Sequence, residues 1–122
     1  MTLVDTSIWV DHLRRGNATL QQRLVDGTVL AHPFIVGELA CGHLRARDEV
    51  LGLLRALPAA RVVEHDEMLD FIKRYALAGR GIGWIDAHLL ASARLAHAEL
   101  WTLDHALADA AERVGVVAAG AQ

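Results

Sequence analysis

Short apolar runs alternate along the chain with longer stretches of helical periodicity, and this alternation limits the possible folds more than any other feature of the sequence. The apolar or β-branched runs predict buried strands at residues 2–4, 28–31, 61–63, 100–103 and 116–118. The stretches between them predict helices at residues 7–15, 18–26, 33–44, 48–57, 66–78, 87–97 and 105–114. We therefore expect an α/β fold with a largely parallel sheet and helices on both faces, in which a ligand lies outside the carboxyl ends of the strands.

Composition narrows the class of protein further. The chain has 122 residues, which predicts a single domain over residues 1–122, and the 53% of hydrophobic residues excludes intrinsic disorder. The longest stretch without Asp, Glu, Lys or Arg runs only from Gly27 to Gly37 and contains Pro33, so no membrane-spanning helix and no membrane partner is expected. The first residues lack the basic segment of a secretory signal peptide, and we expect a cytoplasmic protein. A net charge of -3 argues against binding nucleic acid through bulk charge alone.

Two acidic residues are predicted to lie within apolar faces of helices. The neighbours of Glu38 at three and four residues in either direction are Phe34, Ile35, Cys41 and Gly42. The corresponding neighbours of Asp86 are Ile82, Gly83, Leu89 and Leu90. Because an ionised carboxylate is costly to bury, both side chains are expected to face inward only with a counter-charge from elsewhere in the fold.

Two further acids directly follow predicted strands. Asp5 follows the first strand and Asp104 follows the fourth, so both are expected at carboxyl ends of strands. If Glu38 and Asp86 enter from the same edge of the sheet, four carboxylates converge there and require a cation. Hard oxygen donors without His or Cys companions favour Mg²⁺ or Mn²⁺ over zinc, and such a metal suits phosphoester chemistry.

Simpler interpretations exist for each acid taken alone. Asp5, Asp86 and Asp104 each precede a predicted helix and could be N-caps. Glu38 lies within a helix and cannot be a cap, but it could pair with an arginine of another helix. No nucleophile elbow and no phosphate-binding glycine loop is found, and the three tryptophans, Trp9, Trp84 and Trp101, are interpreted as packing residues.

Four motifs in order give the chain a resemblance to a known family. They are V-D-T-S-I-W at residues 4–9, P-F-I-V-G-E-L around Glu38, W-I-D-A-H-L-L-A-S-A around Asp86 and L-W-T-L-D-H-A-L at residues 100–107. With these motifs the sequence resembles the PIN-domain ribonucleases and, among them, the VapC toxins of bacterial VapBC toxin–antitoxin pairs. The resemblance implies a three-layer sandwich with a central, mostly parallel sheet of about five short strands.

The resemblance also implies roles for individual residues. Asp5, Glu38, Asp86 and Asp104 would form the acidic catalytic quartet that binds Mg²⁺ or Mn²⁺, with Asp5 and Asp86 as the first choices for direct ligands. Ser7 and Thr102 would be supporting polar residues. The implied activity is the metal-dependent hydrolysis of RNA phosphodiesters by a toxin of a type II pair, which would inhibit translation or growth.

Partners follow from the same resemblance. We expect an RNA substrate, a homodimer and a VapB-like antitoxin whose amphipathic segment occupies an apolar groove of the early helices, formed by Ile8, Trp9, Leu13, Leu20 and Leu24. The same five residues could instead be plain core. Weak candidates for contacts with RNA phosphates are Arg14, Arg15, Arg45, Arg47, Arg80 and Arg94.

Two other functions are weighed against the nuclease. A phospho-acceptor receiver domain fits poorly, because Lys73 is the only lysine and Asp5 has no acidic neighbour in the sequence. The stronger alternative is a non-catalytic PIN-like interaction module that binds an antitoxin or another partner. The presence of acids at all four positions favours the enzyme.

Overall fold

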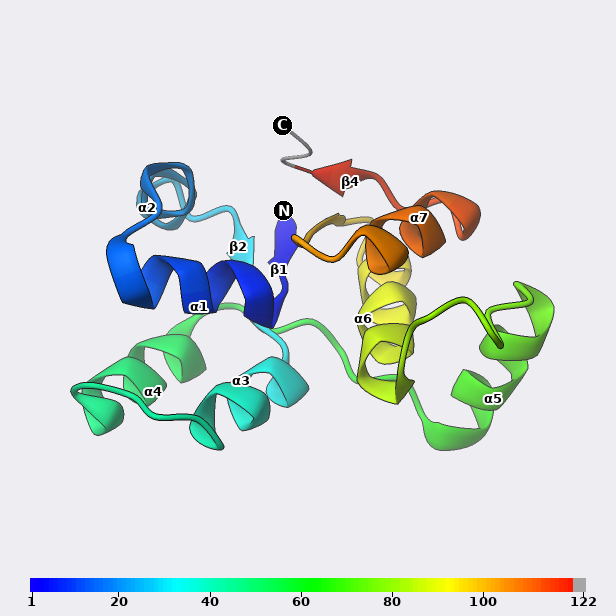
Figure 1. The fold of residues 1–122 in the computed structure, drawn as a ribbon, viewed down its shortest axis with the longest axis horizontal. Coiled ribbons are helices and arrows are strands. Elements are labelled where there is room, and N and C mark those ends of the chain that lie inside the picture. The colour runs from blue at the N-terminus through cyan, green and yellow to red at the C-terminus, as the bar shows by residue number, and fades with distance from the viewer. Residues whose placement is uncertain (120–122) are drawn as a thin grey trace.

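The structure is a computed structural model that describes residues 1–119. Within these residues four short strands alternate with seven helices (Figure 1). The elements in chain order are β1 (Thr2–Val4), α1 (Thr6–Arg15), α2 (Ala18–Val25), β2 (Val29–Leu30), α3 (Pro33–Ala40), α4 (Arg47–Ala56), α5 (His65–Arg74), α6 (Trp84–Leu95), β3 (Glu99–Trp101), α7 (His105–Arg113) and β4 (Ala118–Ala119). The predicted single domain extends to residue 122, and its last three residues lie outside the described part.

The four strands form one parallel sheet in the order β2-β1-β3-β4. The central pair is β1 and β3, in which Leu3 lies opposite Leu100 and Val4 opposite Trp101. Figure 1 shows α1 to α4 on one side of β1 and α5 to α7 on the other. The predicted α/β fold with a parallel sheet is confirmed, and its carboxyl edge brings together the segments that follow β1 and β3.

The prediction of a fifth strand at residues 61–63 is wrong for the sheet described here. The chain makes only an isolated parallel bridge between Ala31 and Ala59, and residues 61–63 have no strand partner among residues 1–119. The carbonyl of Arg61 instead accepts a hydrogen bond from the Ser92 hydroxyl at 2.7 Å. The segment is therefore held against α6 by a side chain, which a β-branched run in the sequence does not reveal.

Three predicted helix boundaries differ from the structure by three residues or more. α3 ends at Ala40 instead of residue 44, and α5 ends at Arg74 instead of residue 78, shortly before Ala76 takes a left-handed conformation with φ 52°. α6 begins at Trp84, three residues earlier than predicted. Asp86 is therefore not an N-cap; its Oδ2 accepts a hydrogen bond from the N–H of Gly83, the residue that precedes the helix, at 3.2 Å.

The core is formed by leucines of the central strands and of the helices packed on them. Leu3 and Leu100 of the sheet and Leu89, Leu90 and Leu107 of α6 and α7 are all fully buried. Trp9 and Trp101 are buried as predicted, whereas Trp84 is 40% exposed and packs only partly, against the rings of His65 and His88. None of the helices in residues 1–119 is both long enough and apolar enough to cross a membrane.

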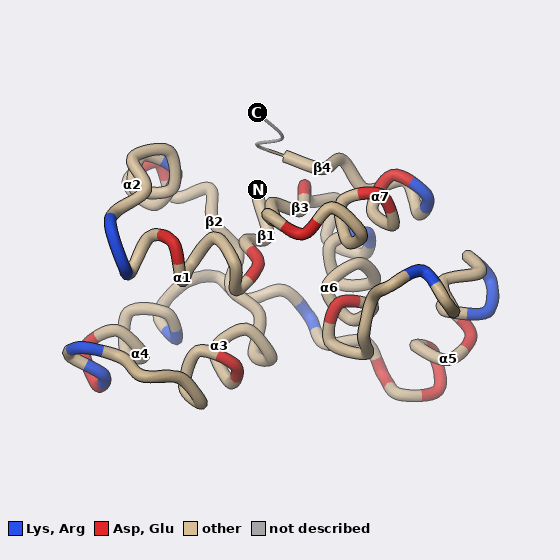
Figure 2. Tube along the Cα trace, viewed as in Figure 1, with Lys and Arg blue, Asp and Glu red and all other residues tan. Residues whose placement is uncertain are grey.

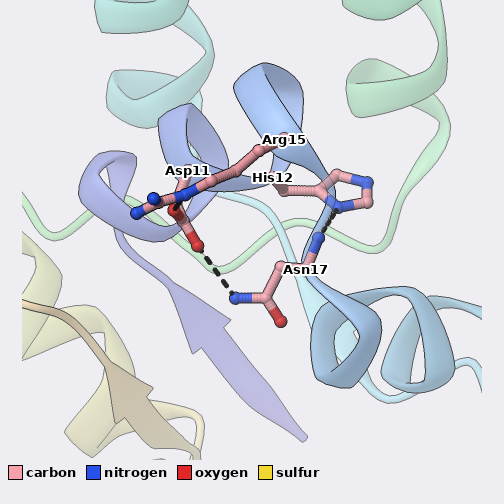
Figure 3. A network of polar contacts seen from close by, with 4 residues as sticks. All are labelled: Asp11, His12, Arg15 and Asn17. Carbon is pink, nitrogen blue, oxygen red and sulfur yellow. Dashed lines mark hydrogen bonds and ion pairs between the residues drawn. The ribbon is translucent and has the colours of Figure 1, made fainter.

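A polar network joins α1 to α2 (Figure 3). The Asp11 carboxylate accepts hydrogen bonds from Arg15 Nε at 2.7 Å and from Asn17 Nδ2 at 3.3 Å, while the Asn17 N–H donates to His12 Nδ1 at 3.0 Å. These contacts, with the hydrogen bond of Arg15 as the largest, hold the pKa of Asp11 below its usual range. Arg15 is thus engaged by its own helix.

Candidate metal centre

Asp5 lies where β1 ends and α1 begins, and its side chain is 8% exposed. Its Oδ1 accepts a hydrogen bond from the Thr6 N–H at 2.7 Å, so it is the N-cap of α1. Its Oδ2 accepts hydrogen bonds from the hydroxyls of Ser7 at 3.1 Å and Thr102 at 2.6 Å. Both residues predicted to support the site therefore contact this carboxylate, and they fix its orientation.

Thr102 connects Asp5 to Asp104. Its hydroxyl donates to Asp5 and accepts a hydrogen bond from the Asp104 N–H at 3.0 Å. Asp104 is the N-cap of α7, and its Oδ1 accepts from the N–H groups of Ala106 and Leu107. The alternative interpretation as N-caps is therefore correct for Asp5 and Asp104. It does not exclude the site, because each cap bond occupies one oxygen and Asp104 is exposed to solvent.

Glu38 does not face the core. It is exposed in the last turn of α3, which buries Ile35 and Leu39 instead. The inward orientation predicted for Glu38 is wrong because Cys41 and Gly42, two of the neighbours used for that prediction, lie on the surface themselves. Nor does Glu38 pair with an arginine in residues 1–119.

Thr6 is a site residue that the sequence analysis missed. Its hydroxyl donates to Glu38 Oε1 at 2.7 Å and so links α3 to the first residue of α1. Since the Thr6 N–H also donates a hydrogen bond to Asp5, Thr6 contacts two of the four acids. The only signal in the sequence is its place between Asp5 and Ser7.

Asp86 is half-buried at the start of α6. Burial raises the pKa of the Asp86 carboxyl, the hydrogen bond from Gly83 lowers it, and the negative charges of Asp5, Asp104 and Glu38 raise it further. In Figure 2 the acidic segments at the starts of α1, α6 and α7 and near the end of α3 lie around the middle of the molecule. The fold thus brings the other three predicted acids close enough for their charges to act on Asp86.

His32 positions the helix that carries Glu38. It is the N-cap of α3, with its Nδ1 accepting from the Phe34 N–H at 3.0 Å and its Nε2 lying 3.1 Å from the Ser92 hydroxyl. Burial, together with the charge of His88, lowers the pKa of His32 to about 4. The ring is therefore neutral at neutral pH, which the acceptor role of Nδ1 requires.

The donor set fits a hard divalent cation. The ion pairs of residues 1–119 are Arg15–Asp11 and Arg23–Glu99, so no basic side chain of this part neutralises the four acids. The carboxylates do not form a tight cage, because no three His, Cys, Asp or Glu side chains in the described chain are placed to hold a single ion. Carboxylate oxygens are nevertheless the donor type that Mg²⁺ and Mn²⁺ prefer, and Mg²⁺ can bind a protein through one or two carboxylates while it keeps several waters.

The structure places some of the candidate arginines near one of the four acids and others in different contacts. Arg14 and Arg45 line a groove that also includes Glu38. Arg80 is exposed in the loop before α6, with its Nε bonded to the Ala76 carbonyl at 2.8 Å. Arg94 is not brought to the acids; it donates to the Val114 carbonyl at 2.7 Å and stacks on Tyr75. Arg47 begins α4 and is exposed.

Comparison with known proteins agrees with this arrangement. The profile of the PIN-domain family matches residues 2–113. The chain is a PIN domain. It is 46% identical over 120 residues to Ribonuclease VapC32 of Mycobacterium tuberculosis, strains CDC 1551 and H37Rv, with 98% of this chain and 97% of the relative covered. The predicted membership in the VapC family is thereby confirmed.

Solved structures place the PIN domain in the same fold. FitAcB from Neisseria gonorrhoeae superposes with a TM-score of 0.63 at 19% identity, covering 97% of this chain and 96% of that one. PAE2754 from Pyrobaculum aerophilum gives a TM-score of 0.64 at 17% identity, covering 96% and 82%. At such low identity these similarities establish the fold alone, and the predicted fold class is confirmed.

Proposed function

We propose that this PIN domain is a metal-dependent endoribonuclease, the toxin of a type II toxin–antitoxin pair, and that it uses Mg²⁺ or Mn²⁺. The observation that carries the proposal is the arrangement of four acids in which the charges of Asp5, Glu38 and Asp104 act on Asp86. The near full-length similarity to a protein named as a ribonuclease supports RNA as the substrate.

The chain's own residues prepare this site for hydrolysis. Ser7 and Thr102 fix the Asp5 carboxylate, and Thr6 fixes Glu38, so both acids are oriented before any ligand binds. A bound cation would stabilise the charged form of Asp86, because it would offset the repulsion from the three neighbouring acids. A bound divalent cation would lower the pKa of a water and neutralise charge on the phosphate. Hydrolysis then joins the water oxygen to phosphorus and breaks a phosphorus–oxygen bond of the RNA backbone.

The first prediction concerns metal dependence. Purified protein should cleave RNA with Mg²⁺ or Mn²⁺ and lose that activity in excess EDTA, because the predicted donors are all hard oxygens. Gel analysis of a structured RNA, with metal restored after EDTA as the control, measures this. Full cleavage in EDTA would contradict the metal proposal, and intact RNA under all conditions would favour a non-catalytic interaction module.

The second prediction concerns the antitoxin. Of the five residues predicted to form its groove, Ile8, Trp9 and Leu20 are buried core and only Leu13 is clearly exposed. A groove of about 480 Å³ does lie between α1 and the end of α3, lined by Val10, Leu13, Leu39 and Leu44 with Arg14 and Arg45. We propose that an amphipathic segment of a VapB-like antitoxin binds there.

Leu13→Glu should therefore abolish copurification with a co-expressed VapB-like antitoxin, since it places a charge in the apolar groove. Val25→Glu on α2, a residue that is 76% exposed, is the matched control and should retain the partner. If the wild-type protein retains no partner on co-expression, or if Leu13→Glu retains it fully, this groove is not the antitoxin site.

A further inference from the structure

A second cavity, of about 750 Å³, lies between α6 and the segment that enters α5. Its lining includes four ring-bearing residues, Phe34, His65, Trp84 and His88, and the charged residues Arg61, Glu64 and Glu67. We call it the aromatic pocket. The rings form a continuous chain of contacts, with centroid distances of 5.2 Å for His65–Trp84, 4.8 Å for Trp84–His88 and 4.8 Å for Phe34–His88.

The aromatic pocket is built from the same helices as the acidic site. Trp84 is the first residue of α6 and precedes Asp86 by two positions, while Phe34 precedes Glu38 by one turn of α3. At the start of α6 the N–H of Gly83 donates to Asp86 Oδ2 at 3.2 Å, so this helix start connects the aromatic pocket with the acidic site. A phosphate backbone that crosses this N-terminus would therefore contact both.

The lining favours a flat, polar-edged ring over a phosphate. Trp84 exposes 40% of its surface and so remains partly accessible to a ligand. The two glutamates would repel a phosphate but can accept hydrogen bonds from amino groups of a base. His88 is 3% exposed and contributes a ring to the wall of the pocket, where it packs against Phe34 and Trp84.

We propose that the aromatic pocket binds one unpaired nucleobase of the RNA, stacked on Trp84, while the neighbouring phosphate lies at the acidic site. The proposal rests on the nuclease function proposed above. Stacking on an aromatic side chain is the usual way in which proteins hold splayed bases of single-stranded RNA. Trp84 is then a substrate-binding residue and not part of the core.

The fluorescence of Trp84 tests the proposal without relying on activity. Trp9 and Trp101 are buried, so quenching by an added ligand reports mainly on Trp84. Titration of a short single-stranded RNA in EDTA should quench the wild-type emission, and the same RNA with abasic sites should quench it much less. Absence of quenching by the intact RNA would overturn the proposal, and cleavage assayed in parallel with Mn²⁺ separates this result from failure of the nuclease function.

Variants give a second readout. Trp84→Ala should bind the RNA about 5- to 150-fold more weakly, as expected for one lost base–aromatic stack, and Trp84→Phe should retain most of the affinity. Leu53→Ala, an apolar residue of α4 that is 65% exposed, is the matched control. Unchanged RNA affinity in Trp84→Ala would overturn the proposal. Conversion of a wild-type dimer to a monomer with unchanged RNA affinity would instead assign this face to a second copy of the chain.

Discussion

Asp86→Asn should reduce RNA cleavage by on the order of 100-fold or more, because metal catalysis supplies several kcal/mol of transition-state stabilisation. The variant should nevertheless be as stable as the wild type, or more stable, without metal. Burial and three neighbouring acids raise the pKa of the Asp86 carboxyl, so its charged form is disfavoured in the folded state and its removal relieves repulsion. Asn can still accept the hydrogen bond from Gly83.

Paired thermal melts with and without Mn²⁺ measure the other half of this prediction. At a metal concentration of 100 times Kd the wild type should gain about 2.7 kcal/mol, and Asp86→Asn should gain much less. Glu49→Gln is the matched control, since Glu49 is an acid in the first turn of α4 and is exposed. A wild-type metal shift together with undiminished cleavage in Asp86→Asn would remove Asp86 from the site.

Thr102→Val should lower metal affinity and cleavage by roughly 10- to 100-fold, the usual effect of removing a residue that orients a metal ligand. The Thr102 hydroxyl donates to Asp5 at 2.6 Å and accepts from the Asp104 N–H, and valine keeps the shape but loses both bonds. The free energy of unfolding should also fall by about 1.5–3 kcal/mol, because the hydrogen bond to the carboxylate is charge-assisted.

The serine variant separates positioning from packing. Thr102→Ser retains the hydroxyl and should restore both metal affinity and cleavage, whereas a role in packing alone would make serine, which lacks the methyl group, worse than valine. Thr19→Val, an exposed position on α2, controls for the general effect of the substitution. Isothermal titration with Mn²⁺ and cleavage rates measure the result, and wild-type affinity in Thr102→Val would show that Asp5 needs no such support.

The features that could be predicted from the sequence are those that depend on neighbouring residues in the chain. The first strand was predicted at its observed bounds, Thr2–Val4, because an apolar run meets a strong helix-capping residue at Asp5. The same pattern of strand, acid and helix recurs at Asp104. In a parallel sheet the ends of adjacent strands meet at one edge, so the proximity of these two acids follows once β1 and β3 are neighbours.

Features that depend on distant contacts could not be predicted. The exposure of Glu38 depends on where α3 ends, and the sequence gives no strong stop signal before Gly42. The segment at residues 61–63 satisfies a carbonyl through Ser92, which is 31 positions away. α6 begins at Trp84, three residues earlier than its apolar periodicity suggests, and the hydrogen bond from Gly83 to Asp86 that accompanies this start is not evident from the sequence.

The hydrogen bond between Asp5 and Thr102 joins residues that are 97 positions apart in the chain. The site therefore has a very high contact order, since its first acid leaves the ribosome long before the hydroxyl that orients it. We infer that a nascent or truncated chain lacking Thr102 has no organised site and is not a nuclease. In a cell that makes a harmful enzyme beside its inhibitor, this topology would delay toxicity until nearly the whole chain has been synthesised and folded.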